Sequence, residues 1–541
     1  MAPALSRRVS AFEHLTAEPL DVLVVGGGAT GAGIALDAVS RGYRVALVER
    51  EDLASGTSSK SSKLIHGGVR YLATGDVAMV VEGVRERNRL RDLAPHLVRP
   101  LGFVIPVDTV ADTLMLRAGL SLYDAIGIGQ GARTHRRLSV REVLMDAPGL
   151  ATLGSRGGFR YDDAQTDDAR LVLAVAQAAH EHGATIATHA AVTAVGARTD
   201  GCWQVTVRDE LAGQDLDVAA RWVVHAGGAW ADTLGDVGPD RIGTRIQPAK
   251  GVHLTFRRAD VPVNRAIVIP SVRGDGRRVF LVPWGDQVYL GTTDDVDMST
   301  GAPTVDAVDA AYLLDALNAA FATSLSVDDA IGAWAGWRPL VAGDGETKDL
   351  SRRHVVLEPE PGLVIVTGGK LTTYRRMARD TVDHVAAGDG VRRPSRTGTI
   401  PLGARGSALD GLGRARRAIQ AAGGDISLAG SLYHRHGDRA PVVVAESATA
   451  GELDRLVPEL PYLVGEVRWA VRHEWALTLA DVLERRLRVS LRDAAAGGPA
   501  IEHAARIMGE ELGWSDDERA RQVRAYVDGV VRERGVVPLA R

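Results

Sequence analysis

The sequence predicts an α/β protein with a Rossmann-type nucleotide-binding unit near its N-terminus and a helical region at its end. Three observations predict this fold class. A strand, a glycine-rich turn, a helix and a second strand follow one another over Asp21–Glu49. Segments of alternating polar and apolar character later interrupt the nucleotide-binding pattern. Beyond Gly406 the chain becomes rich in Ala, Arg, Glu and Leu, which is typical of helices.

The segment Asp21–Glu49 has the layout of a complete βαβ unit. The apolar run Val22–Val25 predicts a strand, and the apolar spacing over Ala29–Ser40 predicts a helix. A second apolar run, Arg44–Val48, predicts the next strand. Glycines fill the turn between the first strand and the helix, as in dinucleotide-binding folds.

Three glycines and one acid of this unit suit a dinucleotide. Gly26 permits the tight turn, Gly28 lets backbone approach a pyrophosphate, and Gly31 lets the helix pack on the strand. The N–H groups at the helix N-terminus attract the anion. Glu49 follows Gly31 by 49 − 31 = 18 residues, and is expected to accept hydrogen bonds from ribose hydroxyls. Because a carboxylate disfavours a 2′-phosphate, the ligand should be FAD or NAD.

Composition argues against several classes of protein. With 541 residues the chain has room for two or three domains, and a net charge of −4 leaves no basic excess for nucleic acid. The single cysteine, Cys202, cannot form an internal disulfide and fits a reducing compartment.

Met1–Pro19 lacks the apolar core of a signal peptide, and no apolar run reaches the length of a membrane span. Any membrane contact is therefore expected to be peripheral. The histidines lack metal-ligand spacing, so no metal is expected.

Side chains that could bind a ligand are most concentrated in the segment Gly56–Leu72. It holds five Ser and Thr hydroxyls, two lysines, one histidine and one arginine, and Gly67-Gly68 permits close backbone approach. A loop that binds a phosphate group and a flat ring needs hydroxyl and cationic side chains of these kinds. An exposed Ser-rich loop is the alternative, but such a loop would rarely end in Leu-Ile-His-Gly-Gly and continue into an amphipathic helix.

The residues SSKSSKLIHGGVRYL, placed after the GGGATGAGIALDA fingerprint, resemble the FAD-dependent glycerol-3-phosphate dehydrogenase family, a branch of the D-amino-acid-oxidase-like flavoproteins. Five further motifs agree with this resemblance. They are Lys250–His253 (KGVH), Phe280–Gly285 (FLVPWG), Gly291–Asp294 (GTTD), Gly336–Leu340 (GWRPL) and Gly368–Tyr374 (GGKLTTY). The resemblance covers almost the whole chain.

The resemblance implies a Rossmann-type FAD-binding domain interleaved with an antiparallel-sheet substrate (cap) domain, followed by an α-helical C-terminal domain. The FAD-dependent oxidoreductase region is expected over 17–387, a linker over 388–406 and the helical domain over 407–541. Within the first region, FAD-binding segments are expected at about 17–101, 154–246 and 341–387, and cap segments at about 102–153 and 247–340.

Local patterns add a helix over Asp167–Gly183 and strands over Thr185–Thr188, Cys202–Val207 and Leu363–Val366. The many arginines near Asp481–Arg488 are interpreted as a salt-bridged surface rather than a catalytic cluster, with contact to anionic lipid as a further alternative.

The resemblance also places the FAD contacts. The turn after Leu363–Val366 would bring a helix N-terminus to the pyrimidine edge of the flavin, where negative charge develops on reduction. The turn after Trp222–Val224 has His225 and Gly228 where family members carry an Asn-Ala-Thr-Gly type turn, so only backbone contacts are carried over there. The FAD-binding residues implied are Gly26, Gly28, Gly31, Glu49, Thr57, Ser58, Ser59, Ser62, Lys63, Ala226, Gly227, Gly369, Lys370, Leu371 and Thr372.

Oxidation of a phosphorylated secondary alcohol requires cations for the substrate and a base for the hydroxyl proton. The substrate-binding positions that match the family are Arg70, Tyr71, Arg338, Arg352 and Lys370. His66 is the preferred base and His253 the second choice, because a neutral imidazole accepts a proton near physiological pH. Arg338 is a candidate to stabilise the alkoxide or to bind substrate, and Trp337 replaces the smaller aliphatic residue common before this arginine.

The leading functional hypothesis is FAD-dependent oxidation of sn-glycerol 3-phosphate to dihydroxyacetone phosphate, with electrons passed to a quinone at a membrane surface. A glycerol-3-phosphate oxidase that uses oxygen shares every motif. A related FAD enzyme that acts on another small anionic substrate is a further alternative. A flavoprotein without turnover would need only the Gly26–Glu49 unit. We also expect a homodimer and a cytoplasmic protein, peripheral on the inner face of the membrane.

Overall fold

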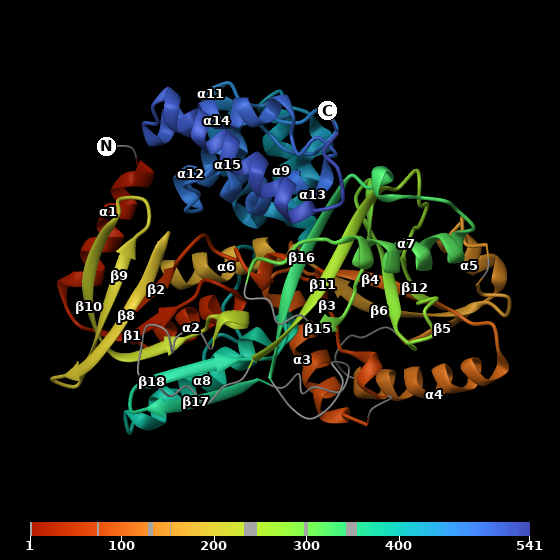
Figure 1. Cartoon of the computed structure of the whole chain (residues 1–541), viewed down its shortest axis with the longest axis horizontal. Helices are drawn as coiled ribbons and strands as arrows, with labels where there is room; N and C mark the ends of the chain where they lie inside the picture. Colours follow the sequence, from red (N-terminus) through yellow and green to blue (C-terminus); the bar gives the residue numbers. More distant parts are fainter. Residues whose placement is uncertain are drawn as a thin grey trace.

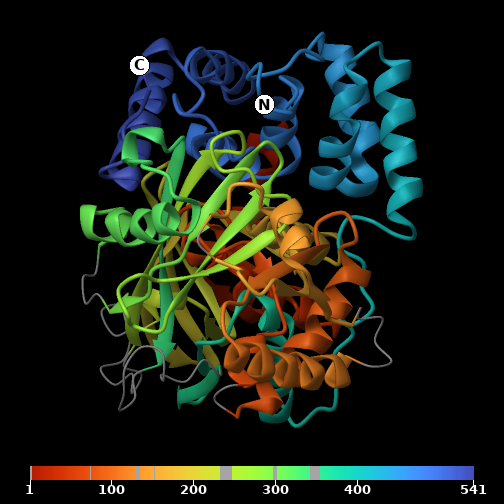
Figure 2. The same ribbon diagram turned by 90° about the vertical axis from the view of Figure 1, so that its right-hand side faces the viewer.

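A computed structural model describes residues 3–72, 75–127, 134–151, 153–231, 246–296, 301–341 and 354–540. Two sheets lie side by side, and the C-terminal helices gather at one end of both (Figure 1). Figure 2 shows the same arrangement after a quarter turn. No helix of the described ranges is both long and apolar enough to cross a membrane.

The first sheet has eight strands in the order β17-β18-β10-β1-β2-β7, and β9 and β8 continue it from β10. Strands β18, β10, β1, β2 and β7 run parallel to one another. Their carboxyl ends meet at one edge, where open α/β sheets bind their ligands. The bounds are β1 Leu20–Val25, β2 Val45–Glu49, β7 Thr185–Thr188, β8 Ala190–Thr199, β9 Cys202–Asp209, β10 Gln214–His225, β17 Val355–Glu360 and β18 Leu363–Thr367.

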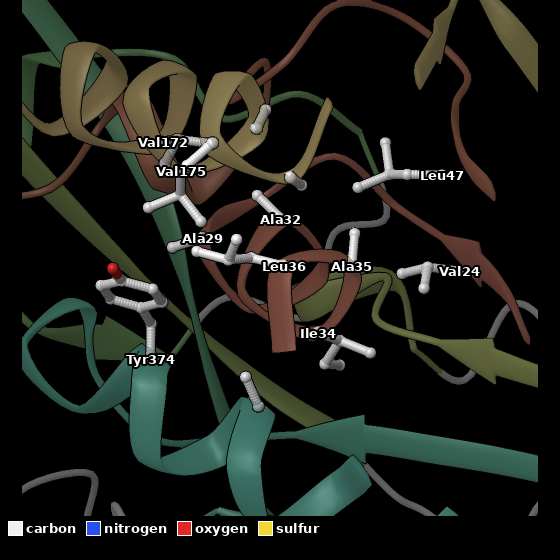
Figure 3. Packing of buried hydrophobic residues seen from close by; sticks show 14 of the residues in the cluster. Val24, Ala29, Ala32, Ile34, Ala35, Leu36, Leu47, Val172, Val175 and Tyr374 are labelled. Carbon is white, nitrogen blue, oxygen red and sulfur yellow. The ribbon is translucent and has the colours of Figure 1, made fainter. Parts of the chain in front are cut away.

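Three helices cover one face of this sheet. Helix α2 (Ala29–Ser40) lies between α6 (Asp168–Glu181) and α8 (Tyr374–Gly388), and its alanines let the neighbours approach closely (Figure 3). The other face is covered by α1 (Pro3–Ala17), through its buried residues Phe12 and Leu15. The predicted helix and flanking strands of the βαβ unit are confirmed, whereas α1 was not predicted.

The second sheet has ten strands in the order β15-β11-β14-β13-β12-β4-β6-β3, with β16 beside β11 and β5 beside β6. Its pairings are antiparallel except that between β12 and β4. The strands are β3 Leu64–Ile65, β4 Arg99–Pro106, β5 Arg136–Leu138, β6 Gly158–Gln165, β11 Ile246–Arg257, β12 Ala266–Pro270, β13 Arg278–Trp284, β14 Gln287–Gly291, β15 Asp295–Val296 and β16 Gly332–Val341. The helices around it are α3 Val77–Leu93, α4 Val110–Gly127, α5 Val140–Asp146 and α7 Ala307–Phe321.

The structure differs from the expected segments in two respects. Strands β3 and β6 pair in the second sheet, although both lie in segments expected to belong to the FAD-binding part. The segment 102–153 contributes β4 and β5 to that sheet but also the two helices α4 and α5. The apolar spacing in α4 is helical, and this local period prevails over the alternating pattern expected for a sheet segment.

The C-terminal domain is helical, as predicted. Its helices are α9 Ala408–Ala421, α10 Ala429–His436, α11 Ala440–Ala450, α12 Gly465–His473, α13 Val489–Arg492, α14 Pro499–Leu512 and α15 Asp516–Arg534, with a π-helical turn over Asp481–Arg486. The connection between α8 and α9 packs on the first domain, because Ser395 and Thr397 donate hydrogen bonds to Asp37 of α2.

The interpretation of the arginines near Asp481–Arg488 as surface residues is wrong for three of them. Arg485 and Arg486 are buried and pair with Asp52, each at 2.6 Å. Arg488 is 2% exposed and pairs with Asp167 and Asp168. These carboxylates lie in the first domain, so the arginines bind the C-terminal domain to it and cannot contact lipid.

Candidate active site

The carboxyl edge of the first sheet is shaped by glycines at the end of β1. Gly26 has φ +110°, and a Cβ there would lie 2.7 Å from the carbonyl oxygen of Ala226. The Ala226 N–H donates to the carbonyl of Val25 at 2.8 Å, which joins the ends of β10 and β1. A Cβ at Gly31 would collide with the carbonyl of Gly26. The predicted glycine roles at the turn and at the helix contact are therefore visible in the structure.

The N-terminus of α2 opens beside Gly28. The Ala29 N–H donates to Ser58 Oγ at 2.9 Å, and a Cβ at Gly28 would lie 3.1 Å from the same oxygen. Helix N-termini attract anions through their unpaired N–H groups. Gly28 and Ser58 therefore flank a site suited to a pyrophosphate.

Glu49 ends β2 next to this turn. Its carboxylate accepts hydrogen bonds from the N–H of Gly27 at 2.5 Å and from the N–H of Glu51 at 2.9 Å. Burial raises the pKa of Glu49, and these two N–H groups oppose the shift. The side chain thus lies at the predicted end of β2, held by backbone donors.

A second strand-to-helix turn follows β18 at the same edge. Gly368 and Gly369 have φ +80° and +73°, and a Cβ at Gly369 would collide with Met377 of α8. Lys370 caps a short 3-10 turn over Leu371–Thr373 that leads into α8. The predicted helix start after the two glycines is confirmed.

The hydroxyl-rich segment, Gly56–Leu72, lies between the two sheets and is held by contacts with other parts of the protein. Thr57 Oγ1 donates to the carbonyl of Trp337 at 2.6 Å. The Lys63 ammonium donates to Asp168 and to the carbonyl of Ser59, both at 3.0 Å. Burial lowers the pKa of Lys63 to about 8, and Asp168 opposes this shift. Ser59 is fully buried. The Lys63 side chain is therefore directed to Asp168.

The C-terminal domain also holds this segment. Arg488 Nη1 donates to the carbonyl of Ser59 at 3.4 Å, and the Lys60 ammonium donates to Glu533 at 2.6 Å. The hydroxyl-rich segment is thus fixed from both domains.

His253 is buried beside Ser62. The two share a hydrogen bond of 2.9 Å between His253 Nε2 and Ser62 Oγ. The imidazole stacks on the indole of Trp334 with ring centroids 4.6 Å apart and an interplanar angle of 7°. Burial, with smaller contributions from the cations Lys63 and Arg338, lowers the pKa of His253 well below its usual value. His253 is therefore neutral and a weak base.

His66, Tyr71 and Lys370 are brought together where the loop meets the second turn. The His66 N–H donates to Thr372 Oγ1 at 3.2 Å. Gly68 has φ +79°, and a Cβ there would lie 3.8 Å from His66 Nδ1 and 2.6 Å from the Tyr71 ring. The Lys370 ammonium lies 3.7 Å from the centroid of that ring. The predicted base and two of the predicted substrate residues thus form one cluster.

Arg338 lies on β16, where three of the sequence motifs converge. Its guanidinium donates to Asp294 Oδ1 at 2.9 Å, to Thr292 Oγ1 at 2.8 Å and to the carbonyl of Lys250 at 3.3 Å. A quarter of the side chain, 24%, remains exposed. The GTTD and KGVH motifs therefore hold the arginine of GWRPL in place while leaving part of it accessible.

Comparison with known proteins places these features in a family. A family model described as FAD dependent oxidoreductase matches residues 21–383, and one described as the C-terminal domain of alpha-glycerophosphate oxidase matches residues 395–519. The glycerol-3-phosphate dehydrogenase of Mycobacterium leprae (strain TN) is 36% identical over 526 residues, which cover 96% of this chain and 89% of the relative. The chain belongs to the FAD-dependent glycerol-3-phosphate dehydrogenase family.

Solved structures agree with this assignment. The glycerol-3-phosphate dehydrogenase of Bacillus halodurans, complexed with FAD, superposes with a TM-score of 0.82 at 29% identity and 98% coverage of both chains. The L-alpha-glycerophosphate oxidase of Mycoplasma pneumoniae, with FAD bound, has a TM-score of 0.54 at 21% identity. It covers 70% of this chain and 97% of its own, and shows that the fold is shared. The predicted family and fold class are thus confirmed.

FAD is the cofactor of this dehydrogenase family member, and the residues at the sheet edge fit it. A larger side chain at Gly28 would enter the space before the N-terminus of α2, and Gly26 permits the tight turn that precedes it. Glu49 lies beside this tight turn, and the turn at Gly369 lies at the same edge. Among the described residues there is no cluster of His, Cys, Asp or Glu that could hold a metal ion.

Not every predicted contact can be placed. Arg352 lies outside the described residues, and so does the side chain of Arg70. His225 is buried, and burial lowers its pKa to about 4. In the turn that follows it, the Ala226 N–H already donates to the carbonyl of Val25. The FAD and substrate contacts of individual residues stay predictions.

Sequence reasoning missed two buried carboxylates that hold the loop. Asp168 accepts from the N–H and hydroxyl of Ser61 as well as from Lys63, and Asp163 accepts from the N–H of Gly67 at 3.0 Å. The only signal for them was the pair of Asp-Asp steps that flank the end of β6.

Proposed function

We propose that this flavoprotein oxidises sn-glycerol 3-phosphate to dihydroxyacetone phosphate and passes the electrons to a quinone. The observation that carries the proposal is the cluster of His66, Tyr71 and Lys370, where two family motifs meet. Anaerobic addition of glycerol 3-phosphate should bleach the flavin absorption, whereas glycerol should not. A yellow protein that glycerol 3-phosphate leaves oxidised would reject the proposal.

The chemistry divides between the cofactor and the chain. FAD, when bound, would supply the acceptor for the hydride that leaves C2 of the substrate. His66 takes the hydroxyl proton as the carbonyl forms, since a neutral imidazole is a base near physiological pH. Lys370 and Arg338 neutralise the phosphate and the developing alkoxide, because cations bind such anions with strong charge-assisted hydrogen bonds.

Replacing Arg338 with alanine should weaken substrate handling while FAD stays bound. Removing a partly buried charge partner costs on the order of a few kcal/mol, which corresponds to a loss of about 10²-fold in kcat/KM. Steady-state kinetics with glycerol 3-phosphate measure this loss, and the absorption spectrum reports FAD content. Arg273→Ala is a suitable control, because Arg273 forms an exposed ion pair with Asp315. Normal kinetics in Arg338→Ala would remove this residue from the substrate site.

The electron acceptor separates a dehydrogenase from an oxidase. Both share the residues described above, so the distinction must come from the reaction of the reduced enzyme. We propose quinone as the acceptor. Reoxidation of the reduced enzyme should be much faster with a soluble ubiquinone or menaquinone analogue than with dissolved oxygen. The reverse order would identify a glycerol-3-phosphate oxidase.

A quinone acceptor calls for contact with a membrane, and α4 supplies a suitable surface. Its outer side exposes Val110, Leu114, Met115 and Leu122. Figures 1 and 2 show α4 at the outer edge of the molecule, at the end away from the C-terminal helices. Among the described residues of 108–160, the exposed charged side chains are one aspartate and five arginines, namely Asp108, Arg117, Arg136, Arg137, Arg141 and Arg156. An apolar helix face that also carries an exposed arginine, here Arg117, suits an anionic lipid surface.

The double substitution Leu114→Gln and Met115→Gln should weaken binding to vesicles that contain phosphatidylglycerol. These side chains are 63% and 61% exposed, and burying each in lipid is worth roughly 1.5 kcal/mol or less. Because the two contributions together reach at most about 3 kcal/mol, binding should fall by roughly tenfold, and by no more than about 10²-fold, in a vesicle sedimentation assay. Leu409→Gln, on α9 and 80% exposed, is the control. Unchanged binding by the double variant would exclude α4 as the membrane surface.

We also propose that the protein is a homodimer at the inner face of the cell membrane. Sedimentation velocity of the full chain distinguishes a dimer from a monomer.

A further inference from the structure

A buried cluster of hydrogen bonds holds the peptide that follows His66. Asp163 of β6 accepts at Oδ1 from the Gly67 N–H at 3.0 Å, from the Tyr123 hydroxyl at 2.8 Å and from Arg87 Nη1 at 2.6 Å. Arg87 of α3 also donates to the Tyr123 hydroxyl oxygen at 2.9 Å. The three side chains are only 3–5% exposed. One carboxylate oxygen thus links β6, α3 and α4 to the backbone beside His66.

Stability alone does not account for a charged cluster at this depth. Burying an ion pair costs desolvation energy that its attraction often fails to recover, and apolar side chains of similar volume are frequently as stable. The cluster does what apolar side chains cannot do, because it accepts a hydrogen bond from one specific peptide N–H. Burial, together with Asp163, raises the pKa of Tyr123 well above its usual value, so the phenol remains a donor.

Steric contacts reinforce the same position. A Cβ at Gly67 would collide with the Tyr123 hydroxyl and lie 2.6 Å from Val84. A Cβ at Gly83 of α3 would lie 2.9 Å from the Gly67 carbonyl. On the other side of the His66 Cα, its own N–H donates to the buried Thr372 at 3.2 Å. The peptides on both sides of the imidazole-bearing carbon are therefore fixed.

We propose that Asp163, Tyr123 and Arg87 are positioning residues that set the His66-Gly67 peptide, and through it the imidazole, for proton transfer. They act through Gly67 and are not in contact with substrate. The proposal rests on the function proposed above, in which His66 is the base.

The first test measures the backbone directly, without turnover. In hydrogen–deuterium exchange of the purified protein, peptides spanning 64–68 should exchange faster in Tyr123→Phe and Asp163→Asn than in the parent. Tyr161→Phe is the matched control, because Tyr161 is a buried tyrosine on β6 whose ring packs edge-on against Tyr123. Tyr123→Phe keeps the ring and the charges, so it serves if Asp163→Asn fails to fold. Unchanged exchange at 64–68 in Tyr123→Phe would overturn the proposal.

The second test separates positioning from general destabilisation. Single-turnover flavin reduction by saturating glycerol 3-phosphate should slow by about tenfold to 10²-fold in Tyr123→Phe, since a displacement of about 1 Å can cost that much. The KM should change less than the rate, and FAD content should be retained. An equal loss in Tyr161→Phe, or a parent-like rate in Tyr123→Phe, would overturn the inference. If the parent enzyme itself is not reduced by glycerol 3-phosphate, the proposed function fails, while the exchange experiment still reports on the cluster.

Discussion

Replacing His66 with asparagine should slow flavin reduction by about 10²–10⁴-fold, the loss expected when a general base is removed. Asparagine retains a polar side chain of similar reach but cannot take a proton. The N–H of residue 66 still donates to Thr372, so the loop should keep its position. Stopped-flow absorption under anaerobic conditions measures the rate, and the flavin spectrum shows whether FAD is retained.

The pH profile identifies the base. Imidazole accepts a proton only when neutral, so the rate of flavin reduction should fall at low pH, where the base is protonated. This acid limb should disappear in His66→Asn. The pKa of His253 is lowered well below the usual value, chiefly by burial, so a limb due to His253 would lie at much lower pH. A His66→Asn enzyme with parental rate and profile would transfer the role to His253 or to solvent.

The parts of the fold that were predictable are those set by contacts between near neighbours in the chain. The strand, turn and helix from Leu20 to Ser40 follow from apolar period and from Gly31, whose Cβ position is blocked by the carbonyl of Gly26 five residues earlier. The same holds for β18 and the turn at Gly368 and Gly369, where positive φ values require glycine. For such strand–turn–helix units, the local sequence is enough to predict the structure.

Features that depend on distant partners were not predictable. Arg485 and Arg486 have the composition of a surface segment, yet both pair with Asp52, more than 400 positions earlier in the chain. Strand β6 joins the second sheet because β4 pairs with it over its whole length, and no local pattern specifies that partner. Helix α4 differs for another reason, because the alternating character expected over 102–153 does not hold within Val110–Gly127, where the apolar spacing is helical.

The residues of the candidate site divide in the same way, into those that local sequence predicts and those that depend on distant partners. Motifs located His66, Arg338 and Lys370 as candidate site residues, because each stands in a recognisable sequence. The groups that orient them, Asp163 behind His66 and Asp294 behind Arg338, act through hydrogen bonds. Such a role requires a distance and a direction, which sequence spacing does not provide.

Replacing Gly28 with valine should abolish FAD binding and leave a folded, colourless protein. Gly28 has φ −76°, which any residue can adopt, so the backbone does not require glycine there. A Cβ at this position would lie 3.1 Å from Ser58 Oγ, within the space before the N-terminus of α2. The branched side chain would therefore occupy the site expected for the pyrophosphate, and would displace it from the helix N–H groups.

Two comparisons separate loss of the site from loss of the fold. Gly31→Val should fail to fold, because its Cβ would collide with the carbonyl of Gly26. Gly430→Val on α10 should retain FAD, since a Cβ there would meet nothing within 4 Å. Circular dichroism measures folding, and the absorbance of released flavin measures FAD content. A Gly28→Val protein that purifies with one FAD per chain would show that the pyrophosphate does not bind at the glycine-rich turn, and the cofactor would have to be placed elsewhere along the sheet edge.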